Sequence, residues 1–240
     1  MSDPFGLTII GALDTLEKDG YLKHDLKNRK LIGEINLALQ ANLDYYSFLL
    51  VPNVQASREL ILRDALTNPI AIYSSDNKYL GLTYYLESMF KELITIDELI
   101  KKMVFEVMNY LKIMNNYSSV YKQQKDGKQI SKHDAEIIIK RKQFDDVQNL
   151  IIEILNNKNV KVKQWYRYIK NLRNFVTHEG VLTINYIEDE NIFFYKKHSD
   201  RRYKINIKII VKNLNKFIKI RLALREGLSD VDFWKQKIIK

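Results

Sequence analysis

The scarcity of glycine and proline is the feature that most limits what this sequence can fold into. Only 8 glycines and 3 prolines occur among 240 residues, so few positions favour a tight turn or interrupt a helix. So few glycines and prolines are typical of chains built from long helices. Because 46% of the residues are apolar, the chain has enough apolar side chains to bury a core, which excludes a disordered chain.

Apolar residues at helical spacing predict helices over most of the first 160 residues. Pro52 should end one of these helices. A capping box at Thr95–Glu98 should divide residues 79–116 into two further helices. Ser131, with Asp134 three residues later, should begin the next helix.

After Gly180 the apolar period changes from helical to alternating. Leu182, Ile184 and Tyr186 alternate with polar residues, and the polar run EDEN then leads into IFFYKK. This pattern predicts a small antiparallel β-hairpin at about 181–197. We therefore expect a mainly α fold, a helical bundle that carries this hairpin near its C-terminal end.

The expected organisation is an N-terminal helical extension over 1–78, packed on a main helical domain over 79–240 that carries the hairpin. No stretch reaches the roughly 18 apolar residues that a membrane-spanning helix needs. The chain has no cysteine, which excludes disulfides and thiol nucleophiles and fits a reducing compartment. We expect a cytoplasmic protein without a membrane span.

Charge is spread unevenly along the chain. Residues 1–100 hold 14 acidic and 9 basic residues, a net charge of −5, whereas residues 101–240 hold 15 acidic and 30 basic residues, a net charge of +15. A basic half joined to an acidic half indicates a polyanionic partner, with nucleic acid first and an anionic membrane second. The alternative is a lysine-rich surface without such a partner.

The helix expected over 160–178 holds the candidate reaction centre. Arg173 is followed by Asn174 and, five positions on, by His178. A histidine near its usual pKa can take the proton from a ribose 2′-hydroxyl or give one to the leaving 5′-oxygen. A guanidinium can bind the phosphate and stabilise the charge of the phosphorane. This chemistry needs no metal or other cofactor, and its two proton transfers suggest two histidines from a symmetric dimer.

A regular helix would not bring these two side chains together. Five residues turn by about 500°, a net rotation of about 140°, so Arg173 and His178 would point apart, whereas Asn174 and His178 share a face. Convergence needs a distorted last turn, which Gly180 at a C-cap position favours. The alternative is that His178 is a structural cap of a packed helix.

Two basic tracts are candidates for holding RNA. Residues 161–178 include five basic residues and no acidic one, and residues 196–225 include eleven basic residues and one acidic one. Cations hold phosphates, and aromatic rings can stack on unpaired bases. The candidate RNA-binding residues are Lys163, Arg167, Lys170, Lys196, Lys197, Arg201 and Arg202. The alternatives are a solvated helix face and, for 204–225, attachment to an anionic membrane surface.

The pattern Arg173-Asn174-x-x-x-His178 at the end of a late helix resembles the R-x4–6-H motif of the HEPN superfamily, in which Asn commonly follows the Arg. The resemblance covers about 79–180 in pattern and is specific at these three residues. It implies an α-helical, dimeric, metal-independent endoribonuclease in which Arg173 and His178 are catalytic and Asn174 supports them. The expected product carries a 2′,3′-cyclic phosphate.

The resemblance also implies a biological setting. Many members of the superfamily act as toxins or in antiviral defence, so we expect a toxin or phage-defence effector with an antitoxin or regulatory protein as partner. Other members are not catalytic. The alternative expectation is therefore an RNA-binding or dimeric scaffold protein of the same shape.

Overall fold

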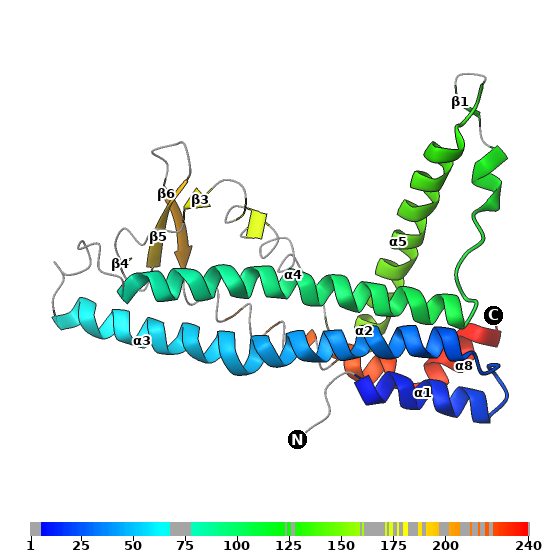
Figure 1. Ribbon diagram of the computed structural model, residues 1–240, viewed down its shortest axis with the longest axis horizontal. Helices are drawn as coiled ribbons and strands as arrows, with labels where there is room; N and C mark the ends of the chain where they lie inside the picture. Colours follow the sequence, from blue (N-terminus) through cyan, green and yellow to red (C-terminus); the bar gives the residue numbers. More distant parts are fainter. Residues whose placement is uncertain are drawn as a thin grey trace. The chain divides into compact units, whose positions relative to one another are not determined.

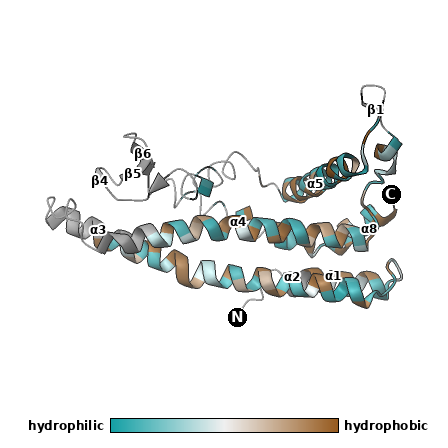
Figure 2. Cartoon of the chain, turned by 45° about the horizontal axis from the view of Figure 1, so that its top comes forward, coloured by the Kyte–Doolittle hydropathy of each residue, from teal (hydrophilic) through white to brown (hydrophobic). Residues whose placement is uncertain are grey.

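The computed structural model shows a mainly helical chain, which confirms the expected fold class (Figure 1). Hydrophobic and hydrophilic residues both occur along the full length of its long helices, as in amphipathic helices (Figure 2). The structure describes residues 6–67, 78–122, 124–125, 128–158, 160, 171, 173–174, 177, 180–181, 187–188, 191–196, 202–206, 212, 216, 219–220 and 223–239. Among these residues, no helix is both long and apolar enough to cross a membrane.

The elements follow in chain order. The helices are α1 (Gly6–Lys18), α2 (Leu26–Asp44), the π-helical η1 (Tyr45–Leu50), α3 (Val51–Thr67), α4 (Lys78–Tyr110), the 3-10 helix η3 (Ser118–Lys122), α5 (Lys132–Asn157) and α8 (Val231–Ile239). The strands are β1 (Gln124–Lys125), β2 (Lys128–Gln129), β3 (Gly180–Val181), β4 (Ile187–Glu188), β5 (Asn191–Lys196) and β6 (Arg202–Asn206).

Strand β1 pairs with β2, and β5 pairs antiparallel with β3, β4 and β6. In register, Gly180 lies opposite Lys196, and Tyr195 lies opposite Arg202. Residues 182–186, within the predicted hairpin, lie outside the described residues. The hairpin over 181–197 therefore stays a prediction.

The chain forms two compact units, each assembled from separate stretches of sequence. Unit 1 comprises Met1–Gln40, Leu99–Val162 and Ile220–Lys240, and unit 2 comprises Ala41–Glu98 and Lys163–Lys219. Helices α2 and α4 each contribute residues to both units. The division into an extension over 1–78 and a main domain over 79–240 stays a prediction.

Helix α4 runs without a break through the predicted capping box, so the predicted division at Thr95 is wrong. The Thr95 hydroxyl donates to the Lys91 carbonyl at 3.2 Å, one turn back along the same helix. Ile94 and Ile96, on either side of it, are both buried. A continuous apolar face therefore outweighs a sequence pattern that also occurs inside helices.

Pro52 does not end a helix, which corrects a second prediction. The backbone stays helical from α2 through η1 into α3, and the Val51 N–H donates to the Tyr46 carbonyl, five residues back. In a regular helix a proline ring clashes with the carbonyl four residues earlier. The wider π turn before Pro52 relaxes this constraint. The Asn53 amide then donates to the Leu49 carbonyl at 2.6 Å, so a side chain bonds one carbonyl of this turn.

Helix α5 begins where the sequence predicts. The Ser131 hydroxyl oxygen accepts from the Asp134 N–H at 3.1 Å and donates to the Asp134 carboxylate at 2.7 Å. Ser131 is therefore the N-cap of α5, and it satisfies one of the first free N–H groups of the helix.

Unit 1 encloses an apolar core in which α1 and α8 lie side by side (Figure 1). Its buried side chains include Ile9, Leu13, Leu16, Val104, Val107, Leu150, Ile154, Leu228 and Trp234. Trp234 is fully buried, and its indole N–H donates to the Leu228 carbonyl at 2.9 Å. Gly227 packs against Ile154 so closely that a Cβ at this position would overlap the Ile154 Cγ2 atom. This glycine serves close helix packing rather than a turn.

Unit 2 has its own core along η1, α3 and the first part of α4. Its buried side chains include Tyr46, Leu50, Val54, Leu86, Phe90 and Leu93. The stretch of unit 2 over residues 163–219 contains Arg173 and most of the basic residues that the sequence singles out.

Candidate functional site

The structure places two of the three predicted catalytic residues in contact. Arg173 and Asn174 are helical and half-buried, and the Arg173 Nη1 atom donates to the Asn174 Oδ1 atom at 3.0 Å. This bond holds one edge of the guanidinium and leaves its other N–H groups for a second acceptor. Asn174 therefore bonds the Arg173 guanidinium, and the catalytic roles of both residues stay predictions. His178 lies outside the described residues.

The backbone departs from a regular α-helix at Thr177. Thr177, next to His178, is exposed and lies in a π-helical turn. In a π turn the hydrogen bonds join residues five apart, which is the spacing of Arg173 and His178. Gly180 then begins strand β3 and pairs with Lys196. The convergence of Arg173 and His178 stays a prediction, because Thr177 is the one described residue between Asn174 and Gly180.

The other predicted RNA-binding residues are only partly described. Lys196 ends β5 and Arg202 begins β6, so the backbone brings both to the sheet that contains Gly180. The remaining candidates lie outside the described residues: Lys163, Arg167, Lys170, Lys197 and Arg201.

Three lysines of the second basic tract are exposed in the same unit as Arg173. Lys212, Lys216 and Lys219 are each helical and exposed. Their spacing of four and three residues is that of one helix face. A row of cations with this spacing can follow a phosphate backbone.

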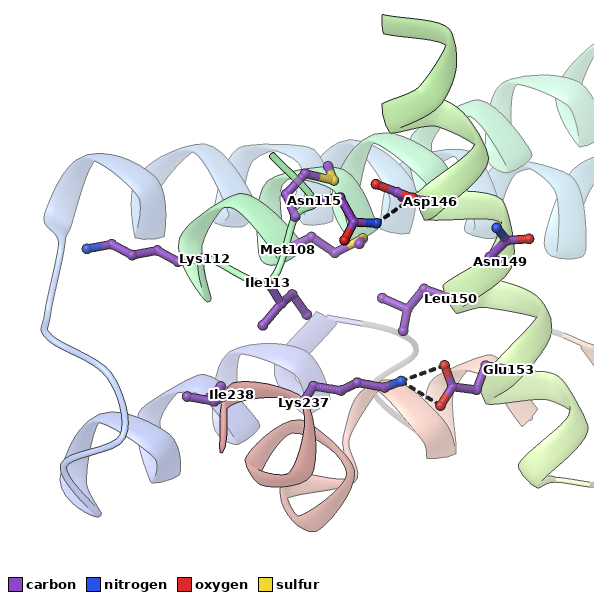
Figure 3. A pocket seen from close by; sticks show the side chains of 11 residues that line it. Met108, Lys112, Ile113, Asn115, Asp146, Asn149, Leu150, Glu153, Lys237 and Ile238 are labelled. Atoms are coloured by element: carbon purple, nitrogen blue, oxygen red, sulfur yellow. Dashed lines mark hydrogen bonds and ion pairs between the residues drawn. The ribbon is translucent and has the colours of Figure 1, made fainter. Parts of the chain in front are cut away.

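A pocket of about 550 Å³ lies in unit 1, and no motif in the sequence predicts it. Its lining residues are Met108, Lys112, Ile113, Met114, Asn115, Asp146, Asn149, Leu150, Glu153, Lys237 and Ile238. Figure 3 shows Asp146, Leu150 and Glu153 projecting from successive turns of α5 toward the segment after α4 and toward α8. The volume is typical of small-molecule pockets.

The two carboxylates of this pocket are already paired. Asp146 accepts hydrogen bonds from the Asn115 amide at 2.9 Å and from the Tyr117 hydroxyl at 2.8 Å. Glu153 binds the Lys237 ammonium with 2.6 Å to each oxygen (Figure 3). Burial, followed by the hydrogen bond to Asp146, raises the pKa of Tyr117. These pairs join α5 to the segment after α4 and to α8, so the polar groups of the pocket hold these elements together.

A second polar cluster in unit 1 surrounds Tyr110. The Tyr110 hydroxyl donates to Glu17 at 2.7 Å and accepts from the Asp25 N–H at 3.1 Å. His24 contacts the other Glu17 oxygen at 2.8 Å, and Arg29 lies 3.5 Å from Glu17 and also pairs with Asp14. Burial, followed by the bond to Glu17, raises the pKa of Tyr110 to about 12. Tyr110 therefore stays neutral at physiological pH. Its hydrogen bonds link α1 and the α1–α2 connection to α4.

Two of the three remaining histidines lie among the described residues. His24 is largely exposed apart from its contact with Glu17, and His133 is exposed in the first turn of α5. His198 lies outside the described residues. Within the described ranges, no group of three or more histidine, aspartate or glutamate side chains is placed to hold a metal ion.

Comparison with known proteins gives no match: no family model, no curated protein and no solved structure matches this chain.

Proposed function

We propose that the chain is a metal-independent endoribonuclease of the HEPN type. The observation that carries the proposal is the helical Arg173–Asn174 pair, with its 3.0 Å hydrogen bond, followed by a π turn at Thr177. Such a turn favours convergence of two side chains five residues apart. His178 is then the candidate imidazole on the same face as Arg173.

In the proposed reaction, His178 takes the proton from a ribose 2′-hydroxyl as its oxygen attacks the phosphorus atom. The bond from phosphorus to the 5′-oxygen breaks, and an imidazolium returns a proton to that oxygen. Arg173 binds the non-bridging oxygens of the phosphorane, and Asn174 positions Arg173. The products are a 2′,3′-cyclic phosphate and a free 5′-hydroxyl. A homodimer would supply the second histidine for the second proton transfer.

The proposed RNA-binding surface combines the exposed lysine row in unit 2 with the basic residues of the hairpin over 181–197. Lys212, Lys216 and Lys219 supply three exposed positive charges, and Lys196 lies opposite Gly180 in the backbone pairing. We further propose that the protein acts in the cytoplasm as a toxin or phage-defence effector and that an antitoxin or regulatory protein controls it.

The test is cleavage of mixed RNA by purified protein in the presence of a chelator. His178→Ala and Arg173→Ala should each lower the rate by about 10²–10⁴-fold, because each removes a group that acts in the transition state. Asn174→Ala should have a smaller effect, since it removes only the positioning bond. His133→Ala, at an exposed histidine in unit 1, is the matched control and should cleave normally.

RNA that stays intact with the unchanged protein, while binding is retained, would contradict the nuclease and favour the non-catalytic scaffold. Binding itself is tested by replacing Lys212, Lys216 and Lys219 with glutamine. The salt dependence of affinity for single-stranded RNA should then become shallower, by about 0.7 in logarithmic slope for each phosphate that the variant no longer neutralises. Growth arrest on expression, relieved by His178→Ala, would support the toxin setting.

A further inference from the structure

Helix α5 carries a stripe of exposed apolar side chains in unit 1. Ile137, Phe144 and Ile152 are 52%, 50% and 44% exposed. At 100° per residue, their spacing of seven and eight places all three within an arc of about 80°. Single exposed apolar residues are ordinary, but three on one face of one helix form an apolar patch. The Lys101 ammonium lies 5.3 Å from the centre of the Phe144 ring, a cation–π contact that helps to hold the ring in place.

The stripe is symmetric about its own midpoint, between residues 144 and 145. Ile137 and Ile152 lie at equal distances from this point, and so do Arg141 and Gln148, which occupy the same stripe. An antiparallel copy of the helix related by a twofold axis through the midpoint would place each Ile137 opposite Ile152 of the second copy. This is the self-complementary arrangement that a twofold interface requires.

Charges on the stripe and at its edge fit the same arrangement. Arg141 and Asp145 are both exposed, and neither forms an ion pair with the rest of the described chain. They stand four apart in the order Arg before Asp, which is the weaker order for a pair within a helix. In the antiparallel arrangement, Arg141 faces position 148, and Asp145 of the second copy lies on the adjacent turn. Each dimer would thus contain two Arg141–Asp145 pairs between copies.

We propose that α5 is a self-association face through which two copies of this chain pack antiparallel about a twofold axis between Phe144 and Asp145. This face lies wholly in unit 1, whereas Arg173 belongs to unit 2, so the inference does not depend on the proposed nuclease. The stripe spans 16 residues, about 24 Å of helix. Interfaces of standard size bury about 800 Å² on each partner, and this shorter face should give a weak, concentration-dependent dimer.

The first measurement is self-association by analytical ultracentrifugation over a concentration series. Arg141→Asp and Asp145→Arg should each weaken dimerisation by about tenfold or more, because each dimer contains the altered pair twice. The double variant restores opposite charges between the copies and should recover most of the affinity. Single variants that dimerise like the unchanged protein, or a double variant that remains as weak as the singles, would overturn the proposal.

The second measurement identifies the face itself and is insensitive to any other dimer contact. The chain has no cysteine, so Ile137→Cys with Ile152→Cys gives a clean crosslinking pair. Facing Cα atoms of two packed helices lie within the roughly 7 Å that a disulfide tolerates, so mild oxidation should yield a covalent dimer. The control pair, Leu26→Cys with Leu37→Cys, replaces even more exposed leucines on α2, at 74% and 69% exposure. Equal crosslinking of both pairs, or none by the α5 pair, would refute an α5 interface.

Discussion

Two isoleucines on α5 show how differently one helix can use the same side chain. Ile154 is 1% exposed and packs against Gly227, whereas Ile152, two residues earlier, is 44% exposed. Two residues turn a helix by about 200°, so neighbours of identical chemistry face the core and the solvent. One face of α5 therefore packs in the core of unit 1 and stabilises it, while the exposed face is available for contact with another molecule.

The sharpest test of this contrast is a matched pair of truncations. Ile154→Ala should lower the free energy of unfolding by about 2–5 kcal/mol, because it leaves a cavity in the core. Ile152→Ala should change it by less than about 0.5 kcal/mol when measured in the monomer. Urea unfolding followed by circular dichroism measures both. Similar losses for the two variants would show that the exposed face is also packed.

A second prediction concerns the residue that Ile154 packs against. Gly227→Ala places a methyl group where the Ile154 side chain lies, so it should cost about 1–3 kcal/mol through overpacking. Gly33→Ala is the control, since nothing lies within 4 Å of a Cβ at that helical position. It should stabilise the protein by about 0.5–1 kcal/mol, the usual gain of alanine over glycine in a helix. Thermal unfolding of the two variants should therefore shift in opposite directions.

Tyrosines extend the contrast between buried and exposed positions to polar groups. Tyr110→Phe removes the hydroxyl that bonds Glu17 and the Asp25 N–H, and it should cost about 1–3 kcal/mol at neutral pH. Tyr121→Phe, at a tyrosine that is 40% exposed, is the control and should be close to neutral. Equal effects would mean that the Tyr110 cluster contributes little.

The stabilisation from Tyr110 should also depend on pH at both ends of the range. Burial raises the pKa of the Glu17 carboxyl, but bonds to Tyr110 and His24 and the Arg29 charge outweigh it, so the pKa lies below its ordinary value of 4.5. This contribution is present above pH 4.5 and is lost as pH falls through the lowered pKa. The Tyr110 pKa is raised from 10.0 to about 12, so its contribution is present below pH 10.0 and is lost as pH rises through about 12. Tyr110→Phe should lack the alkaline loss and show a smaller acid loss in urea unfolding.

The smallest expected effect lies at the border between the two faces of α5. Lys237→Met breaks the ion pair with Glu153, whose side chain is 43% exposed. Solvent screening limits such pairs to at most about 1 kcal/mol. A double-mutant cycle with Glu153→Gln at low and high salt would isolate the coupling energy, which should shrink as salt is added. A coupling energy that does not change with salt would show that the pair is not screened and would contradict this prediction.

Local signals predicted part of the local structure of this chain. The helical character and the start of α5 at Ser131 follow from apolar spacing and a capping hydroxyl. The patterns at Thr95 and Pro52 were misleading, because a Thr-x-x-Glu pattern and a proline have different effects at a helix end, inside a helix, and after a π turn. Burial of Ile94 and Ile96 decided the first case, and it depends on tertiary packing that no local pattern contains.

The candidate sites show the same difference between local and long-range contacts. Arg173 and Asn174 are neighbours in the sequence, so their contact could be anticipated. The unit 1 pocket could not, because Asp146 meets Asn115 and Tyr117 from 31 and 29 residues away. Long-range pairs of this kind depend on how helices pack and leave no periodic trace in the sequence.

The buried indole of Trp234 gives the protein an optical property. The chain has two tryptophans, and the sequence places Trp165 in unit 2 and Trp234 in unit 1. In a Trp165→Phe variant, fluorescence would come from a single indole that is shielded from water and that shifts to the red when its surroundings open. Comparing that emission with far-ultraviolet circular dichroism during denaturation would reveal whether the two units unfold together or in sequence.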